Sequence, residues 1–193
     1  MGKGRLEAFS DGVIAIIITI MVLELKVPAG TNLAALAEAL PVLGSYLLSF
    51  VFVGIYWNNH HHMLHLVKHV NGAILWANLH LLFWLSLVPF ATRWMSESGY
   101  ARGPVALYGL ILVGSGFSYT ILQTCLIRSQ GASSPLAAAV GRDLKGKASV
   151  LAYLIAIAMA FVMPLLSLLI YVGVALLWLC PDPRIERQLR AEP

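Results

Sequence analysis

Charged residues are scarce in this chain. Aspartate, glutamate, lysine and arginine together make up 11% of its 193 residues, whereas hydrophobic residues make up 59%. A soluble domain of this length carries about a quarter charged residues. The composition therefore excludes a soluble globular domain and indicates a protein that crosses the membrane several times, with few residues left outside the spans.

Cysteine is equally rare, and catalytic motifs are missing. Cys125 and Cys180 lie in or beside apolar segments, far apart in the sequence, which does not suggest a disulfide framework. The chain has no Gly-rich phosphate loop, no Ser-His-Asp set and no paired carboxylates, so we expect no enzyme, no cofactor and no organic substrate. The first apolar run is too long for a cleavable signal peptide, and polar residues interrupt its start.

Six apolar runs are candidates for membrane spans, which need roughly 20 residues each. They cover residues 6–27, 36–59, 73–92, 104–127, 148–162 and 165–180, so one six-helix transmembrane domain occupies 1–193. Pro164 favours two short spans joined by a tight turn over one long final helix. We expect Pro41 in the first turns of the second span, where proline is tolerated, and a loop over residues 131–146.

The positive charges fall unevenly between the ends of these spans. If both termini are cytoplasmic, the inner segments hold Lys3, Arg5, Lys68, Arg128, Arg142, Lys145, Lys147, Arg184, Arg187 and Arg190, and the outer segments hold Lys26, Arg93 and Arg102. Such a bias orients membrane proteins and does not indicate a nucleic-acid surface. A five-span model would place the last three arginines outside, which favours six spans.

The first span begins with polar residues, Arg5-Leu6-Glu7-Ala8-Phe9-Ser10-Asp11-Gly12. A carboxylate in hydrocarbon costs roughly 2.5–3.5 kcal/mol, so Asp11 needs a partner or a function. On a helical wheel, Phe9, Ile16, Ile20 and Leu23 form one stripe with Thr19 on its flank. Asp11 points about 150° away from this stripe, and Ser10 about 110° to its other side. By itself, the stripe fits lipid contact or helix packing as well as a pore wall.

These residues also carry a family resemblance. Arg5-(three residues)-Phe9-Ser10-Asp11-Gly12, followed by an Ile-rich helix, resembles the transmembrane protein 175 family. Its members are potassium channels of animal endosomes and lysosomes and of prokaryotic plasma membranes. Further similar segments are Tyr56-Trp57-Asn58-Asn59-His60-His61, Trp76-Ala77-Asn78-Leu79 and Pro89-Phe90-Ala91-Thr92, in the family's order. The resemblance covers nearly the whole chain.

The resemblance implies a homotetrameric potassium channel of the cell membrane, with K⁺ as the permeant ion and the first helix lining the pore. The sequence contains no TVGYG filter. The resemblance instead implies an apolar constriction, which falls on Ile16, Ile20 and Leu23 by distance from Phe9, and a small hydroxyl position on Thr19. A ring of isoleucines can gate by expelling water.

We expect Ser10 and Asp11 to find buried partners at the cytoplasmic ends of the next two spans. The candidates are Trp57, His60, His61 and Asn78. Arg5 is another candidate partner for Asp11, but on a continuous helix the two lie about 120° apart. Their contact would need an unwound first turn or a neighbouring subunit. The resemblance likewise implies that this element, including Phe9, packs against other helices and holds the pore helix in place.

The six histidines, all between His60 and His80, leave other functions open. His61, His65 and His69 would share one helical face, but no carboxylate or cysteine lies in this segment to complete a metal site, so we expect none. Histidine titrates near physiological pH. The alternative function is therefore a proton-coupled secondary transporter that uses Asp11 and the His60–His69 cluster, although no inverted repeat is evident. A membrane enzyme or scaffold built on the histidines is the third hypothesis.

Overall fold

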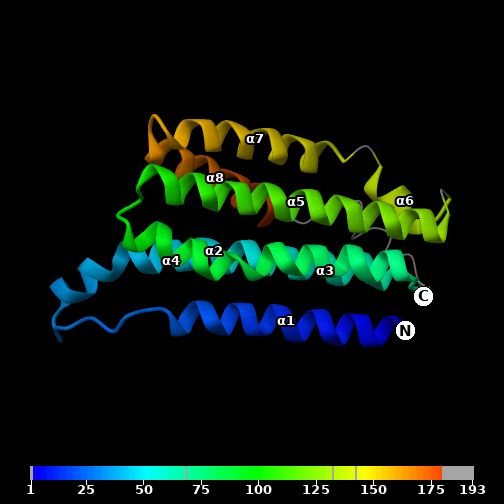
Figure 1. Ribbon diagram of the computed structural model, residues 1–193, viewed down its shortest axis with the longest axis horizontal. Coiled ribbons are helices and arrows are strands. Elements are labelled where there is room, and N and C mark those ends of the chain that lie inside the picture. The colour runs from blue at the N-terminus through cyan, green and yellow to red at the C-terminus, as the bar shows by residue number, and fades with distance from the viewer. Residues whose placement is uncertain (1, 68, 132, 142, 180–193) are drawn as a thin grey trace.

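The computed structural model is helical throughout its regular structure and describes residues 2–67, 69–131, 133–141 and 143–179. The long helices run side by side in one bundle (Figure 1). They are α1 (Lys3–Leu23), α2 (Leu33–His65), α3 (Gly72–Ser86), α4 (Val88–Glu97), α5 (Arg102–Gln130), α6 (Pro135–Val140), α7 (Leu144–Ala160) and α8 (Pro164–Leu179).

The expectation of an all-α membrane protein is confirmed at the level of helix length and composition. Four segments are long and apolar enough to cross a membrane: α1, α2, α5, and the stretch Gly72–Glu97 that α3 and α4 form together. α8 is apolar but shorter, at 16 residues. At 1.5 Å per residue it is about 24 Å long, slightly less than a hydrocarbon core of about 30 Å.

The helix bounds differ from the expected spans near two prolines, Pro41 and Pro89. α2 begins at Leu33, and the side chain of the preceding Asn32 accepts a hydrogen bond from the backbone N–H of Ala35. Pro41 therefore lies two turns inside the helix and not in its first turns as expected. Proline there has no N–H to give to the carbonyl four residues earlier. The third expected span is divided at Leu87, because Pro89 belongs to the first turn of a second helix, α4.

The C-terminal third differs from the expectation at one segment. The stretch expected as a loop contains a short helix, α6, capped by the Ser134 side chain, and buries Leu136 and Ala139. After Ala160, a turn of three residues leads to α8, which begins at Pro164. The two helices on either side of this turn pack against each other.

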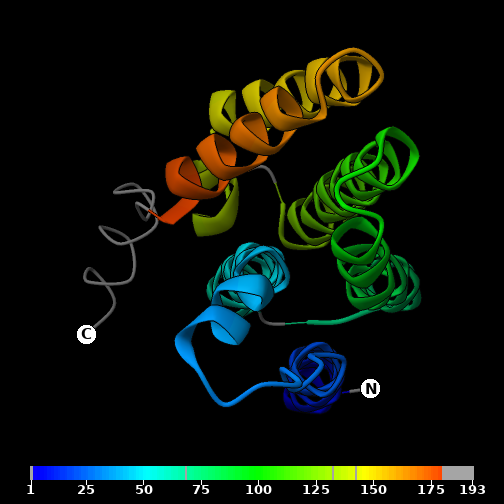
Figure 2. The ribbon, with the colours of Figure 1, turned by 90° about the vertical axis from the view of Figure 1, so that its left-hand side faces the viewer.

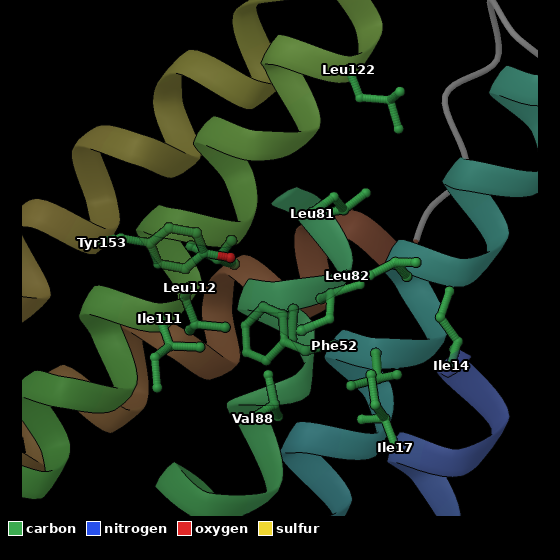
Figure 3. Close-up of a cluster of buried hydrophobic side chains, with 14 of the residues drawn as sticks. Ile14, Ile17, Phe52, Leu81, Leu82, Val88, Ile111, Leu112, Leu122 and Tyr153 are labelled. Carbon is green, nitrogen blue, oxygen red and sulfur yellow. The ribbon is translucent and has the colours of Figure 1, made fainter. Parts of the chain in front are cut away.

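α1 lies at one edge of the bundle, where it packs against α2, α3 and α4. In Figure 2 it is separated from the hairpin of α7 and α8, which lies on the other side of the bundle next to α5. Only one side of α1 enters the core. Figure 3 shows Ile14 and Ile17 of α1 directed toward the cluster that contains Phe52 and Leu82.

The start of α1, the end of α2, the end of α5 and the start of α7 lie at the same end of the bundle (Figure 1). We call this the N-terminal end. The opposite end carries the α1–α2 connection, the α4–α5 connection and the α7–α8 turn.

Five of the thirteen charges used to orient the chain lie outside the described residues: Lys68, Arg142, Arg184, Arg187 and Arg190.

Candidate ion pathway and its support

One face of α1 is left uncovered by the helices of its own subunit. Phe9 is 48% exposed, Ile16 58%, Ile20 42% and Leu23 81%. Thr19 lies on the same exposed side, and its hydroxyl donates to the carbonyl of Ile16 at 2.9 Å. The Thr19 oxygen keeps lone pairs that can accept or coordinate. The four residues of the expected stripe and Thr19 on its flank therefore share a surface that the subunit itself does not bury.

The other face of α1 carries a buried chain of hydrogen bonds. His60 Nε2 of α2 lies 2.7 Å from Asn78 Oδ1 of α3. Asn78 Nδ2 donates to Ser10 Oγ of α1 at 2.9 Å, and Ser10 donates to the carbonyl of Leu6 at 2.8 Å. His60, Asn78 and Ser10 are each at most 1% exposed. The chain joins three helices through polar atoms that water does not reach.

The direction of every hydrogen bond in this chain is determined. Because the Asn78 amide nitrogen donates to Ser10, its Oδ1 is the acceptor, and His60 Nε2 must therefore carry a proton. The chain ends on the Leu6 carbonyl, which belongs to the α1 backbone. Donors and acceptors therefore match along this series of hydrogen bonds from α2 through α3 to α1.

Asp11 takes part in a separate contact at the edge of the subunit. Its Oδ1 accepts the indole N–H of Trp57 at 2.9 Å, and the Trp57 ring stacks on His61 with centroids 6.1 Å apart. Asp11 is half-buried, and Trp57 is 44% exposed. Trp57 is one of the expected partners of Asp11, so this contact agrees with the expectation, whereas the expected burial of the partner is wrong. Of Ser10 and Asp11, only Ser10 enters the core, because the two project to different sides of α1.

The sequence and the helix arrangement match known channels. A family model described as the endosomal/lysosomal potassium channel TMEM175 matches residues 5–89. A protein of Chryseobacterium sp. (strain P1-3), named as a potassium channel, is 55% identical over 190 residues, which cover 98% of this chain and 99% of that protein. This chain belongs to the TMEM175 family.

Further members of the TMEM175 family agree in fold or in sequence. The crystal structure of a lysosomal potassium-selective channel TMEM175 homologue from Chamaesiphon minutus has a TM-score of 0.81 to this chain at 27% identity, covering 94% of this chain and 98% of that one. The Bos taurus protein, named an endosomal/lysosomal proton channel, is 31% identical over 163 residues, which are 74% of this chain and 33% of that protein. These relatives are channels, which confirms the expectation that the chain is not an enzyme.

Within one subunit of this TMEM175-family chain, Arg5 does not meet Asp11, and their contact through a neighbouring subunit stays a prediction. α1 is helical from Lys3 onward, so the unwound first turn that such a contact needs is not formed. In the described part of the chain, Arg5 is exposed and makes no ion pair. Lys3 makes the contact that sequence reasoning missed: its Nζ donates to the carbonyl of His65 at 2.9 Å and lies 3.8 Å from Glu7. This bond ties the start of α1 to the end of α2.

The histidines do not form the expected helical face. α2 ends at His65, and His69 lies beyond it in the connection to α3, so the spacing of four residues from His65 is no longer helical. The rings of His61 and His65 lie 6.4 Å apart between centroids. Within the described residues, no three histidine, cysteine, aspartate or glutamate side chains gather closely enough for a metal ion.

Proposed function

We propose that the chain is the subunit of a potassium-permeable channel in the prokaryotic cell membrane. Its TMEM175 family membership and the potassium channel named at 55% identity support this function. The observation that carries the proposal is the uncovered face of α1, which presents Phe9, Ile16, Ile20 and Leu23 outward while the opposite face is packed and hydrogen-bonded.

The proposed channel is a homotetramer, because one helix per subunit cannot enclose a pathway. Four copies of α1 would surround the axis, so the exposed face of each would line the pore. Each subunit would cross the membrane six times with both termini in the cytoplasm, as the positive charges indicate. The α7–α8 turn lies at the end opposite the α1 start, and α8 runs back from it alongside α7, which supports an even number of crossings (Figure 1).

In this proposal, Ile16, Ile20 and Leu23 form successive apolar rings that close the pathway by expelling water. K⁺ is less strongly hydrated than Na⁺ and would rearrange its water more easily in such a throat. The Thr19 oxygens, next to the Ile16 carbonyls that their hydroxyls contact, would replace part of the lost hydration. Selectivity would then depend on the width and polarity of the throat and not on a carbonyl filter.

The buried chain of His60, Asn78 and Ser10 would act as a brace for α1. It fixes the rotation of α1 about its own axis, because the bond to Ser10 requires that residue to face α3. With this side fixed, the stripe on the other side must face outward. The contact between Trp57 and Asp11 would hold the same helix from its flank, and the Lys3 bond would hold its first turn.

Ion flux through the reconstituted full chain tests this function. We expect liposomes that contain the protein to carry a passive current under a K⁺ gradient at equal pH on both sides, reversing near the K⁺ equilibrium potential. Protein-free liposomes are the control. Flux that needs a proton gradient would contradict the channel and favour the transporter that uses Asp11 and the histidines.

The oligomeric state is measured on the same preparation. Native mass spectrometry of the detergent-purified protein should give four copies of a chain of 21.0 kDa. A monomer that nevertheless conducts K⁺ would contradict the assignment of α1 as the pore wall, because its exposed face would then have no partner copies.

A further inference from the structure

A cavity of about 260 Å³ lies at the opposite end of the bundle, away from the His60–Asn78–Ser10 chain. Its walls come from the end of α1, the connection over residues 24–30, the first turns of α2, and α4. Apolar wall residues include Leu25, Val42 and Leu43, together with the ring of Tyr46. The cavity thus combines an apolar wall with a position at an end of a membrane-spanning bundle.

Five charged side chains line this cavity, and they are unequally paired. Lys26 Nζ and Arg93 Nε both contact the same oxygen of Glu97, at 2.7 Å and 3.3 Å. Glu24 and Glu38 also line the cavity, and neither pairs with a cation in the described part of the chain. The cavity therefore holds three carboxylates and two cationic side chains. Both cations contact the same carboxylate, that of Glu97.

Glu24 occupies an unfavourable position for a negative charge. It is the C-cap residue of α1, directly after Leu23, and it is half-buried. The C-terminus of a helix carries a partial negative charge, so an acid there is destabilised and a cation is favoured. No positively charged residue lies in the last turn of α1. A cationic ligand in the cavity would supply the missing charge.

Arg93 has donors left for an anionic group. It contacts Glu97 through Nε, and its guanidinium has further N–H groups in a fork that suits phosphate. The cavity therefore offers unpaired carboxylates for an ammonium group, an arginine for a phosphate, and an apolar wall for hydrocarbon. A bare metal cation would use only the first of these.

We propose that this cavity binds the headgroup of an aminophospholipid, with its primary ammonium held by Glu24 and Glu38 and its phosphate by Arg93. The site would attach the α1–α2 connection to the membrane surface and so fix the last turn of α1. Binding at this site does not depend on ion conduction, so it stands or falls separately from the proposed channel function.

Lipid binding to the purified full chain tests the proposal. The protein in neutral detergent is titrated with phosphatidylethanolamine, with phosphatidylcholine, whose trimethylated ammonium has no N–H donors, and with soluble phosphoethanolamine. Native mass spectrometry counts bound lipid, and thermal unfolding reports stabilisation. We expect phosphatidylethanolamine to bind about tenfold more tightly than phosphatidylcholine, a difference of about 1.4 kcal/mol, and to raise the unfolding temperature.

Two variants that each remove one negative charge from the cavity show whether the lipid binds there. Glu24→Gln should reduce the preference for phosphatidylethanolamine by most of this factor. Glu38→Gln, at an exposed position of α2, gives the same reading if the first variant folds poorly. Glu7→Gln, which removes a carboxylate at the N-terminal end of the bundle, is the matched control and should leave the preference unchanged.

Three outcomes would overturn the proposal. Equal binding of phosphatidylethanolamine and phosphatidylcholine would show that the site does not recognise the primary ammonium group. An unchanged preference in a folded Glu24→Gln or Glu38→Gln protein would place the lipid elsewhere. Stabilisation by phosphoethanolamine equal to that by the lipid would show that the apolar wall contributes nothing and that the occupant is a soluble phosphorylated amine and not a membrane lipid.

Discussion

Hydrogen-bonding side chains inside the bundle hold α1 at defined points of contact. Asn78 donates a hydrogen bond to Ser10 and accepts one from His60, and all three side chains are buried. A buried polar group without a partner costs more than a made hydrogen bond contributes. Rotation of α1 would break the hydrogen bond between Asn78 and Ser10 and leave the Asn78 N–H without an acceptor, so this set of hydrogen bonds specifies one orientation of the helix.

Removal of the central amide tests this chain. Asn78→Ala would leave the His60 N–H without an acceptor and Ser10 without its donor. We expect the free energy of unfolding to fall by about 1–3 kcal/mol, measured by thermal or denaturant unfolding in detergent. Asn58→Ala, at an exposed amide of α2, is the control and should change stability little. Equal stability of both variants would contradict a structural role for the hydrogen bonds that join His60, Asn78 and Ser10.

The Asp11 contact makes a different prediction, because it is partly exposed to its surroundings. Trp57→Phe keeps a ring that can stack on His61 and loses only the indole N–H. We expect a loss of about 1 kcal/mol, and we expect Asp11→Asn to add little to it. A double-mutant cycle of these two changes measures the coupling. Fully additive losses would mean that the hydrogen bond contributes nothing.

Residue types could be predicted here better than their partners. Polar residues inside apolar helices need partners, which is why Ser10, Asn78 and His60 stood out in the sequence. Periodicity also placed Ser10 and Asp11 on different sides of α1. How deeply each side is buried depends on the neighbouring helices, so the exposure of Asp11 and the bond from Lys3 to the His65 carbonyl could not be predicted.

Close helix packing depends on glycine at particular positions of α5. A Cβ on Gly109 would overlap the hydroxyl of Tyr171 and lie 2.7 Å from Ile157 Cγ1. Tyr171 is fully buried, and its hydroxyl donates to the carbonyl of Val105 at 3.1 Å. The missing side chain therefore allows α8 and α7 to approach α5, and it fixes the hairpin against the rest of the bundle.

Alanine at two glycines of α5 separates packing from helix propensity. Gly109→Ala should destabilise the protein by about 1–3 kcal/mol through overpacking. A Cβ on Gly116 meets nothing closer than the Tyr56 hydroxyl at 3.6 Å. Gly116→Ala should therefore be neutral or stabilise the helix by about 0.5–1 kcal/mol. Unfolding temperatures of the two variants decide this, and the reverse order would show that the α5–α8 packing is wrong.

Long apolar runs predicted the main helices well, while their ends depended on local chemistry. α2 begins at Leu33 because Asn32 caps it, although Pro41 suggested a later start. α6 forms in a Ser/Ala/Gly-rich stretch because Ser134 and Pro135 begin a helix and two apolar residues find a buried place. The interpretation of His61, His65 and His69 as one face assumed a helix that ends at His65.

For the whole molecule, the central feature is that α1 is peripheral in the subunit. It lies at the edge of the bundle (Figure 2), and its packed side meets three helices. Its exposed side carries a row of large apolar residues. Exposed apolar residues are ordinary on a lipid-facing helix, so periodicity alone could not separate a pore wall from a lipid contact. Family membership favours the pore, and the brace on the opposite side gives a physical reason why this face is held outward.

The most direct test is the single-channel behaviour of Ile16→Asn in planar bilayers. Ile16 is 58% exposed in the isolated subunit, and Leu151 of α7 is 60% exposed on the far side of the bundle, which makes Leu151→Asn the matched control. If α1 lines the pathway, Ile16→Asn should wet the throat, raise the open probability several-fold and lower the K⁺/Na⁺ permeability ratio, while Leu151→Asn changes neither. An Ile16→Asn channel with unchanged open probability and unchanged permeability ratio would contradict the account.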